Sequence, residues 1–183
     1  MGAPLLVRFA GGDAGAWRVR AITPIRGEGL PAAGRLAVVE DDSALLSAAR
    51  WVMRGATSNE RYATRTEHDE LSRRQRPLGR PEATRATLIP ITKSAEWWAL
   101  SQDERRALFE ERSRHIAIGL EYLPDIARRL HHGRDLGEPF DFLTWFEYAP
   151  AHAGAFAELV KRLRATAEWG FVEREVEIHL ARE

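Results

Sequence analysis

Residues 83–180 of this chain carry a succession of apolar patterns that few folds can accommodate. Alternation of apolar and polar residues predicts a strand, while apolar residues three and four positions apart predict a helix. The predicted strands lie at 83–92, 140–148 and 171–180, and the predicted helices at 102–123, 124–132 and 151–166. The order strand, helix, helix, strand, helix, strand predicts an α+β fold in which helices pack on one face of an antiparallel sheet.

The first 80 residues carry mainly strand patterns. Strands are predicted at 5–9, 17–25, 36–40 and 50–56, and a helix at 66–74. The glycine-rich segment 11–15 between the first two strands predicts a β-hairpin, and the arginine- and proline-rich segment 73–85 predicts an exposed loop. We expect a single domain, 1–183, with an abbreviated ferredoxin-like half at about 1–80 and a second ferredoxin-like half at about 81–183.

Charge and cysteine content narrow the possible functions. The chain has 27 basic residues, 27 acidic residues and no cysteine. A net charge of zero provides no global field that would attract nucleic acid or an anionic membrane. Without cysteine, the chain cannot form disulfides, iron–sulfur or zinc–cysteine sites, or thiolate-bound or covalently attached haem. No apolar stretch approaches the ~18 residues of a membrane span or forms a signal peptide, so we expect a cytoplasmic protein.

His115 is the most informative candidate residue. It borders the apolar face of the predicted 102–123 helix, one turn before Gly119. A glycine inside a helix costs about 1 kcal/mol relative to alanine, and here it would leave room for a flat group such as haem. A buried structural histidine beside a packing glycine explains the same pattern. The spacing alone therefore leaves both interpretations open.

Arg128 lies thirteen positions after His115, beyond a break that Pro124 predicts. On one straight helix the two residues would be about 20 Å apart, whereas a bend would let both face one cavity. Adjacent arginines such as Arg128 and Arg129 are more often part of a solvated helix face, so this residue also has two interpretations.

Lys93 and Glu168 are a second candidate pair. Lysine occurs only twice in the chain, and Lys93 ends a predicted strand while Glu168 ends a predicted helix. A glutamate commonly accepts the second ring N–H of a metal-bound histidine, and a lysine can keep that glutamate ionised. Lysine–glutamate pairs are also common on protein surfaces, where they contribute little.

Several motifs in the chain resemble the chlorite dismutase family. They are GRPEAT at 79–84, IPITKS at 89–94 followed by Trp97 and Trp98, DERR at 103–106, ERSRHIAIGL at 111–120, DIARRL at 125–130, DLGEPFDFLTWFE at 135–147, Glu168-Trp169 and VERE at 172–175. These motifs extend over most of residues 50–180 and are similar to the short, dimeric branch of the family.

The resemblance implies a dimeric α+β barrel that binds haem b non-covalently, with His115 as the proximal iron ligand. In that arrangement Glu168 hydrogen-bonds the histidine and Lys93 pairs with the glutamate. Arg128 matches the distal arginine of chlorite dismutases, and Gln75 matches the distal glutamine that hydrogen-bonds it in the short branch. Three further residues fall near positions that contact the haem propionates: Asn59, Tyr62 and Trp97.

The implied reaction converts chlorite to chloride and dioxygen, through a ferryl oxidant and hypochlorite that recombine. The implied substrate is a small anion and the implied assembly a homodimer, with no nucleic-acid or membrane partner. Two alternatives remain: another haem enzyme of the superfamily, such as a peroxidase or coproheme decarboxylase, or a haem-binding or haem-sensing module without catalysis.

Overall fold

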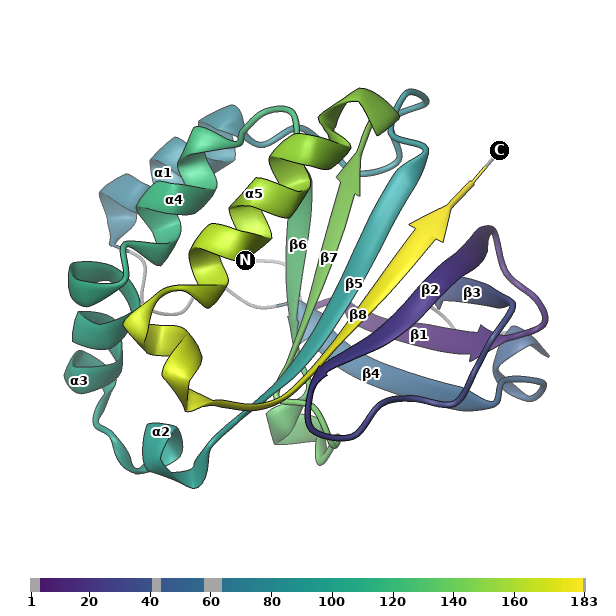
Figure 1. Ribbon diagram of the computed structural model, residues 1–183, viewed down its shortest axis with the longest axis horizontal. Helices are drawn as coiled ribbons and strands as arrows, with labels where there is room; N and C mark the ends of the chain where they lie inside the picture. The colour runs from purple at the N-terminus through teal and green to yellow at the C-terminus, as the bar shows by residue number, and fades with distance from the viewer. Residues whose placement is uncertain (1–3, 41–43, 58–63, 183) are drawn as a thin grey trace.

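Strands form a closed barrel in the computed structural model of the chain, which describes residues 4–40, 44–57 and 64–182 (Figure 1). Their order around the barrel is β1-β3-β2-β8-β5-β7-β6-β4, and each pairing between neighbours is antiparallel. The strands are β1 (Leu6–Gly12), β2 (Trp17–Arg26), β3 (Arg35–Val39), β4 (Trp51–Thr57), β5 (Arg85–Lys93), β6 (Ala127–His132), β7 (Phe142–Tyr148) and β8 (Val172–Ala181). The predicted α+β class and antiparallel pairing are confirmed.

The helices lie outside the barrel, on the side of β5, β6 and β7 (Figure 1). The α-helices are α1 (Arg65–Arg74), α2 (Ala95–Ala99), α3 (Gln102–Arg106), α4 (His115–Glu121) and α5 (Ala153–Arg164). Short 3-10 segments occur at Ala44–Leu46, Arg134–Leu136, Pro150–His152 and Ala167–Phe171, and a π-helical segment at Ala107–Arg112. Among the described helices, none is long and apolar enough to cross a membrane.

Two apolar clusters occupy the two faces of the sheet. Along β5, Ala86 and Leu88 point into the barrel, whereas Ile89 and Ile91 contribute to the cluster that includes α5 residues such as Phe156. The inner cluster combines both halves of the chain, with members such as Val7, Phe9, Trp17, Leu36, Met53, Leu143, Trp145 and Ile178. Strands with one face in each cluster are buried on both sides, which explains the nearly continuous apolar run of β5.

The apolar patterns alone predict an antiparallel sheet with helices on one face, and the structure closes that sheet into one barrel within a single chain. Strand β2 pairs with β8 on one side, and β4 pairs with β6 on the other, so the first four strands and the last four share one barrel. The predicted hairpin of β1 and β2 is wrong, because β1 pairs with β3 and β4 instead. The glycine-rich segment 11–15 is therefore partly strand and leads into a strand that is not its neighbour in the barrel.

Two predicted helices are also different in the structure. Residues 127–132 form β6 because their backbone pairs with β7, from Ala127 opposite Glu147 to His132 opposite Phe142. The predicted 102–123 helix is divided into α3, the π-helical segment and α4. Arg114, with φ of 52°, separates the last two. A left-handed residue ends one helix and lets the next begin in another direction.

Candidate functional site

A cavity lies between the outer face of β5, β6 and β7 and the helices that cover them. It encloses about 530 Å³ of empty space, including the part open to solvent. The sheet contributes Ile91, Lys93, Leu130, His132, Phe142 and Thr144, and the helical side contributes Trp97, Phe109, His115, Glu168 and Trp169. Its lining is mainly apolar and aromatic with a few polar groups, as is typical of ligand pockets.

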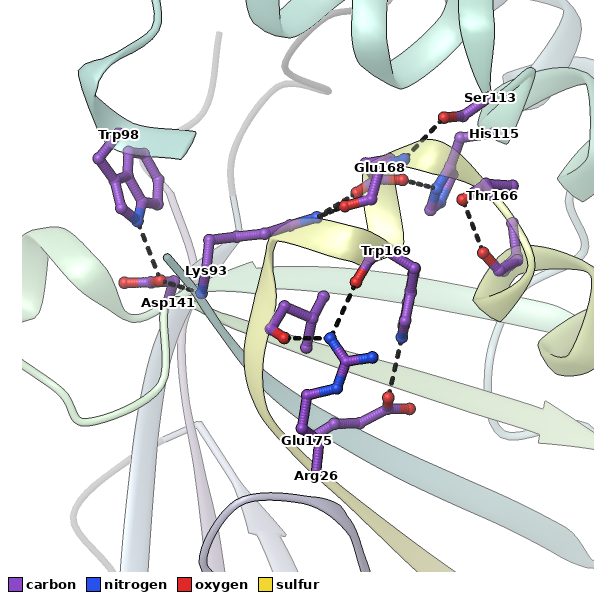
Figure 2. A network of polar contacts seen from close by, with 12 residues as sticks. Arg26, Lys93, Trp98, Ser113, His115, Asp141, Thr166, Glu168, Trp169 and Glu175 are labelled. Atoms are coloured by element: carbon purple, nitrogen blue, oxygen red, sulfur yellow. Dashed lines mark hydrogen bonds and ion pairs between the residues drawn. The ribbon is translucent and has the colours of Figure 1, made fainter. Parts of the chain in front are cut away.

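Three polar residues form a buried chain in the wall of this cavity (Figure 2). Lys93 Nζ donates to Glu168 Oε1 at 2.5 Å, and His115 Nδ1 lies 2.7 Å from Glu168 Oε2. The side chains of Lys93 and Glu168 are 2% and 3% exposed, whereas that of His115 is 17% exposed. The glutamate is thus held between a buried cation and an imidazole that reaches the cavity.

Glu168 remains a carboxylate in spite of its burial. Burial raises the pKa of Glu168, but the charges and hydrogen bonds of His115 and Lys93 outweigh that effect and lower the pKa to about 2. Burial lowers the pKa of Lys93, and the charge of Glu168 opposes that shift. Because a carboxylate can only accept, it fixes the hydrogen of the neutral imidazole of His115 on Nδ1, and that form carries its lone pair on Nε2. The described part of the chain provides no hydrogen-bond partner for that Nε2.

Local backbone features position the imidazole. The side chain of Glu110 accepts a hydrogen bond from the backbone N–H of Ile116 at 2.7 Å, which satisfies one of the free N–H groups at the start of α4. The ring of Phe109 stacks on that of His115, with centroids 4.3 Å apart. Ser113 Oγ accepts from the backbone N–H of Glu168 at 3.0 Å, which ties the start of α4 to the segment that carries the glutamate.

Trp97 and Asp141 surround Lys93. Trp97 is only 1% exposed, and Lys93 Nζ lies 4.5 Å from the centroid of its ring, a cation–π contact. The backbone N–H of Lys93 donates to Asp141 Oδ2 at 2.7 Å, and Trp98 Nε1 donates to the same oxygen at 3.1 Å (Figure 2). The sequence analysis assigns no role to Asp141, Ser113, Phe109 or Glu110. Asp141 and Ser113 bind residues that are distant in the sequence, and Phe109 and Glu110 lie in the π-helical segment, which no sequence pattern predicts.

Arg128 lies on the sheet face that borders the cavity but is not among the described residues that line it. It is half-buried on β6, two and four positions before Leu130 and His132, so strand alternation places all three on one face. Gly119 on α4 lies against its guanidinium: a Cβ at this glycine would be 2.8 Å from Arg128 Nη1. The space beside Gly119 that the sequence suggested for a flat ligand is therefore taken by this arginine. His115 thus belongs to α4, and Arg128 belongs to β6.

The remaining candidate residues are not among the described residues that line the cavity. Gln75 is exposed at the C-terminal end of α1, and the described residues show no hydrogen bond between its side chain and Arg128. Its neighbour Arg74 donates to the carbonyl of Leu120, beside Gly119, so α1 ends close to the helix that contacts Arg128. Asn59 and Tyr62 lie outside the described residues.

Comparisons with known proteins agree on one family. The chlorite dismutase family model matches residues 42–183. A crystal structure of dimeric chlorite dismutases from Nitrobacter winogradskyi is 57% identical, with a TM-score of 0.90, over 96% of this chain and 99% of that one.

More distant relatives match the fold or part of the sequence. A mutant chlorite dismutase from Candidatus Nitrospira defluvii has a TM-score of 0.70 at 21% identity, over 100% of this chain and 93% of that one, which is a likeness of fold. The chlorite dismutase of Ideonella dechloratans is 34% identical over 83 residues, which are 45% of this chain and 27% of that protein. The match therefore spans about a quarter of the length of that curated relative.

Proposed function

Because this chain belongs to the chlorite dismutase family, we propose that it is a haem enzyme that converts chlorite to chloride and dioxygen. The observation that carries the proposal is the buried chain from Lys93 through Glu168 to His115, which presents an imidazole to an apolar cavity. The 57% identical structure, described as a dimeric chlorite dismutase, supports it over nearly the whole chain.

The cavity suits a haem better than a free metal ion. Within the described residues, no group of three or more histidine or acidic side chains could hold an ion. One histidine with a free Nε2 is enough when a porphyrin supplies the other ligands. The apolar and aromatic lining suits a flat macrocycle, and the two buried charges in the wall already neutralise each other. His115 would hold the iron, and Trp97 would lie in the wall beside it.

Some residues of this chain would position the iron ligand, and others would bind the substrate. When bound, haem supplies an iron centre of variable oxidation state to which an anion can coordinate. Glu168 keeps the proton of His115 on Nδ1 and makes the imidazole more basic, which favours higher oxidation states of a bound iron. Lys93 keeps Glu168 ionised, and the stack of Phe109 fixes the ring plane.

Arg128 would act on the substrate. Its guanidinium stays positive at every working pH and offers several N–H donors, so it can draw chlorite into a protein of zero net charge and hold an oxyanion at the reacting centre. Gln75, at the end of α1, would limit the movement of that side chain. Asn59 and Tyr62, with Trp97, are proposed near the propionates.

Three finer features belong to the same proposal. We infer a homodimer, in line with the dimeric neighbour. We also infer that the barrel consists of two ferredoxin-like halves, at about 1–80 and 81–183. In the second half, the strand order β8-β5-β7-β6 supports this, since strands one and three are central. A cytoplasmic location stays a prediction.

Reconstitution with haem b tests the proposal. The wild-type protein should gain a Soret band and release oxygen from chlorite, whereas His115→Ala should lose most haem affinity. Arg128→Ala should keep the haem spectrum and lose most turnover. His152→Ala removes a half-buried histidine that does not line the cavity; it is the matched control and should behave as wild type. Decarboxylation of added coproheme without oxygen release, or no haem binding, would contradict the assignment.

A further inference from the structure

Four arginines line a second hollow, far from the proposed haem cavity. The hollow encloses about 620 Å³ of empty space, including the part open to solvent, and is lined by Ala16, Arg18, Arg35, Arg85, Ala181 and Arg182. Arg85 precedes Lys93 by eight positions on β5, about 26 Å at the rise of an extended strand. Among the described residues, the lining carries four positive charges and no acidic side chain, in a chain whose net charge is zero.

Strand register brings the arginines together. Arg18 on β2 lies opposite Arg35 on β3 and, on its other side, opposite Ala181 on β8, which in turn lies opposite Arg85 on β5. Their sequence neighbours Trp17, Leu36, Ala86 and Leu180 belong to the barrel core. Strand alternation therefore points Arg18, Arg35 and Arg85 to the outer face, around the small side chain of Ala181. Arg182 directly follows the end of β8.

The guanidinium groups of this hollow have no anionic partner among the described residues. Arg35 Nη1 donates to the carbonyl of Gly15 at 3.0 Å, and Arg182 Nη2 to the carbonyl of Arg80 at 2.6 Å, both neutral acceptors. Within the described residues, the side chains of Arg18 and Arg85 make no hydrogen bond or ion pair. Like charges directly opposite each other on paired strands destabilise a sheet. The repulsion between Arg18 and Arg35 is therefore unfavourable, and no described acidic side chain neutralises it.

We propose that this hollow binds a phosphate group, as free phosphate or as part of a phosphorylated small molecule. Guanidinium groups recognise phosphate through pairs of N–H donors, and several of them around one hollow match an anion of more than one charge. Because strands β2 and β3 carry no helix on this face in the described chain, the hollow stays accessible. A face that needed only solubility would mix positive and negative charges.

Binding of phosphate compounds to the holoprotein tests the proposal. Inorganic phosphate, pyrophosphate and ATP are titrated by calorimetry and by thermal unfolding, at constant ionic strength set with sodium chloride. At least one should bind and raise the melting temperature, and the order of affinities identifies the source of the phosphate group. Arg18→Gln and Arg85→Gln should each weaken binding about tenfold, because each removes a charge-assisted contact.

Arg20→Gln is the matched control, because Arg20 is exposed two positions along the same strand face and does not line this hollow. It should change the affinity less than twofold. Arg18→Gln should not lower the melting temperature without phosphate, since it removes a repulsion, so lost binding cannot come from unfolding. Equal losses in Arg18→Gln and Arg20→Gln would indicate a diffuse positive surface and overturn the proposal. So would the absence of binding, or a change in oligomeric mass in Arg18→Gln.

Discussion

Glu168 contributes both to the stability of the fold and to the position of His115 in the candidate site. Its two oxygens accept from two different donors, Lys93 Nζ and His115 Nδ1, in a nearly solvent-free place. A glutamine offers one acceptor and an NH₂ group that would face a donor. Glu168→Gln should therefore leave the buried Lys93 cation without an anion.

Loss of one partner from a buried ion pair typically costs about 3–5 kcal/mol, and we expect a loss of that size in Glu168→Gln. The free energy of unfolding in urea measures it. Glu158→Gln, on the exposed face of α5 beside Lys161, is the control and should change stability by less than about 0.5 kcal/mol. A loss below about 1 kcal/mol in Glu168→Gln would show that the buried pair contributes far less than its geometry implies.

Gly119 gives a second prediction at the residue scale, in which stability and activity change in opposite directions. Gly119→Ala should favour helix α4 by up to about 1 kcal/mol, because alanine restricts the unfolded chain. The new Cβ would meet Arg128 Nη1 at 2.8 Å and displace the guanidinium. On the proposed function, chlorite turnover should fall at least tenfold while haem is retained.

The matched control for this prediction is Gly154→Ala in α5, where a Cβ would meet nothing within 4 Å. It should leave turnover unchanged. Melting temperature, haem spectrum and oxygen release are measured for both variants. Wild-type turnover in Gly119→Ala would mean that the position of the arginine beside this glycine has no role.

Individual residues of the site could be predicted from motifs but not from spacing. Lys93 and Glu168 are 75 positions apart, and His115 lies between them. Periodicity left His115 and Arg128 with two interpretations each, and the resemblance supplied the choice. Asp141 and Phe109 had no pattern of their own, because their contacts depend on tertiary packing and on a π-helical segment.

At the scale of elements, local patterns predicted most strands, but they failed where pairing with a distant strand determines the secondary structure. The strand patterns at 83–92 and 171–180 lie within two residues of β5 and β8. Residues 124–132 have helical spacing, yet 127–132 form β6, because pairing with β7 satisfies their backbone groups and closes the barrel toward β4. No local signal encodes a partner that follows ten or more residues later.

His131 makes the same element sensitive to pH. On β6 it is fully buried, its Nδ1 hydrogen bonds the carbonyl of Leu143, and its Nε2 accepts from Arg129 Nε. Burial lowers the pKa of His131 from 6.5 to about 4, against a raising effect of the Leu143 carbonyl. The unfolded chain therefore binds a proton at higher pH than the folded one.

The sign of this linkage is fixed: the contribution of His131 is complete above about pH 6.5 and is lost as pH falls toward 4. The loss can reach about 3 kcal/mol, at about 1.4 kcal/mol per pKa unit. Urea unfolding of wild type and His131→Asn between pH 7 and 4 measures it, and the difference between the two should shrink by that amount at low pH. His152→Asn, which removes a half-buried histidine outside β6, is measured alongside as the comparison variant. Parallel curves for wild type and His131→Asn would contradict the assignment.

At the scale of the whole molecule, the barrel makes each half depend on the other. The two halves join at two seams, where β2 pairs with β8 and β4 with β6. Their apolar side chains fill one interior, where Phe9 of the first half contacts Trp145 of the second at 5.7 Å between ring centroids. The order of the predicted elements indicates two ferredoxin-like halves in one domain but not the interior they share, because a shared interior is a property of the closed barrel.

A fragment of residues 81–183 contains every described residue of the haem cavity, so a self-sufficient half would bind haem alone. We expect the opposite. Without β1–β4, the inner faces of β5, β7 and β8 would expose Leu88, Trp145 and Ile178, which are at most 2% exposed in the whole chain. Two strand edges would also be left unpaired. The fragment should therefore lack a cooperative unfolding transition and bind an apolar dye such as ANS.

Co-expression with residues 1–80 is the control and should restore both the transition and haem binding, since it restores the pairing of β2 with β8 and of β4 with β6. A fragment that unfolds cooperatively and binds haem alone would show that the interior of the barrel is dispensable for the site.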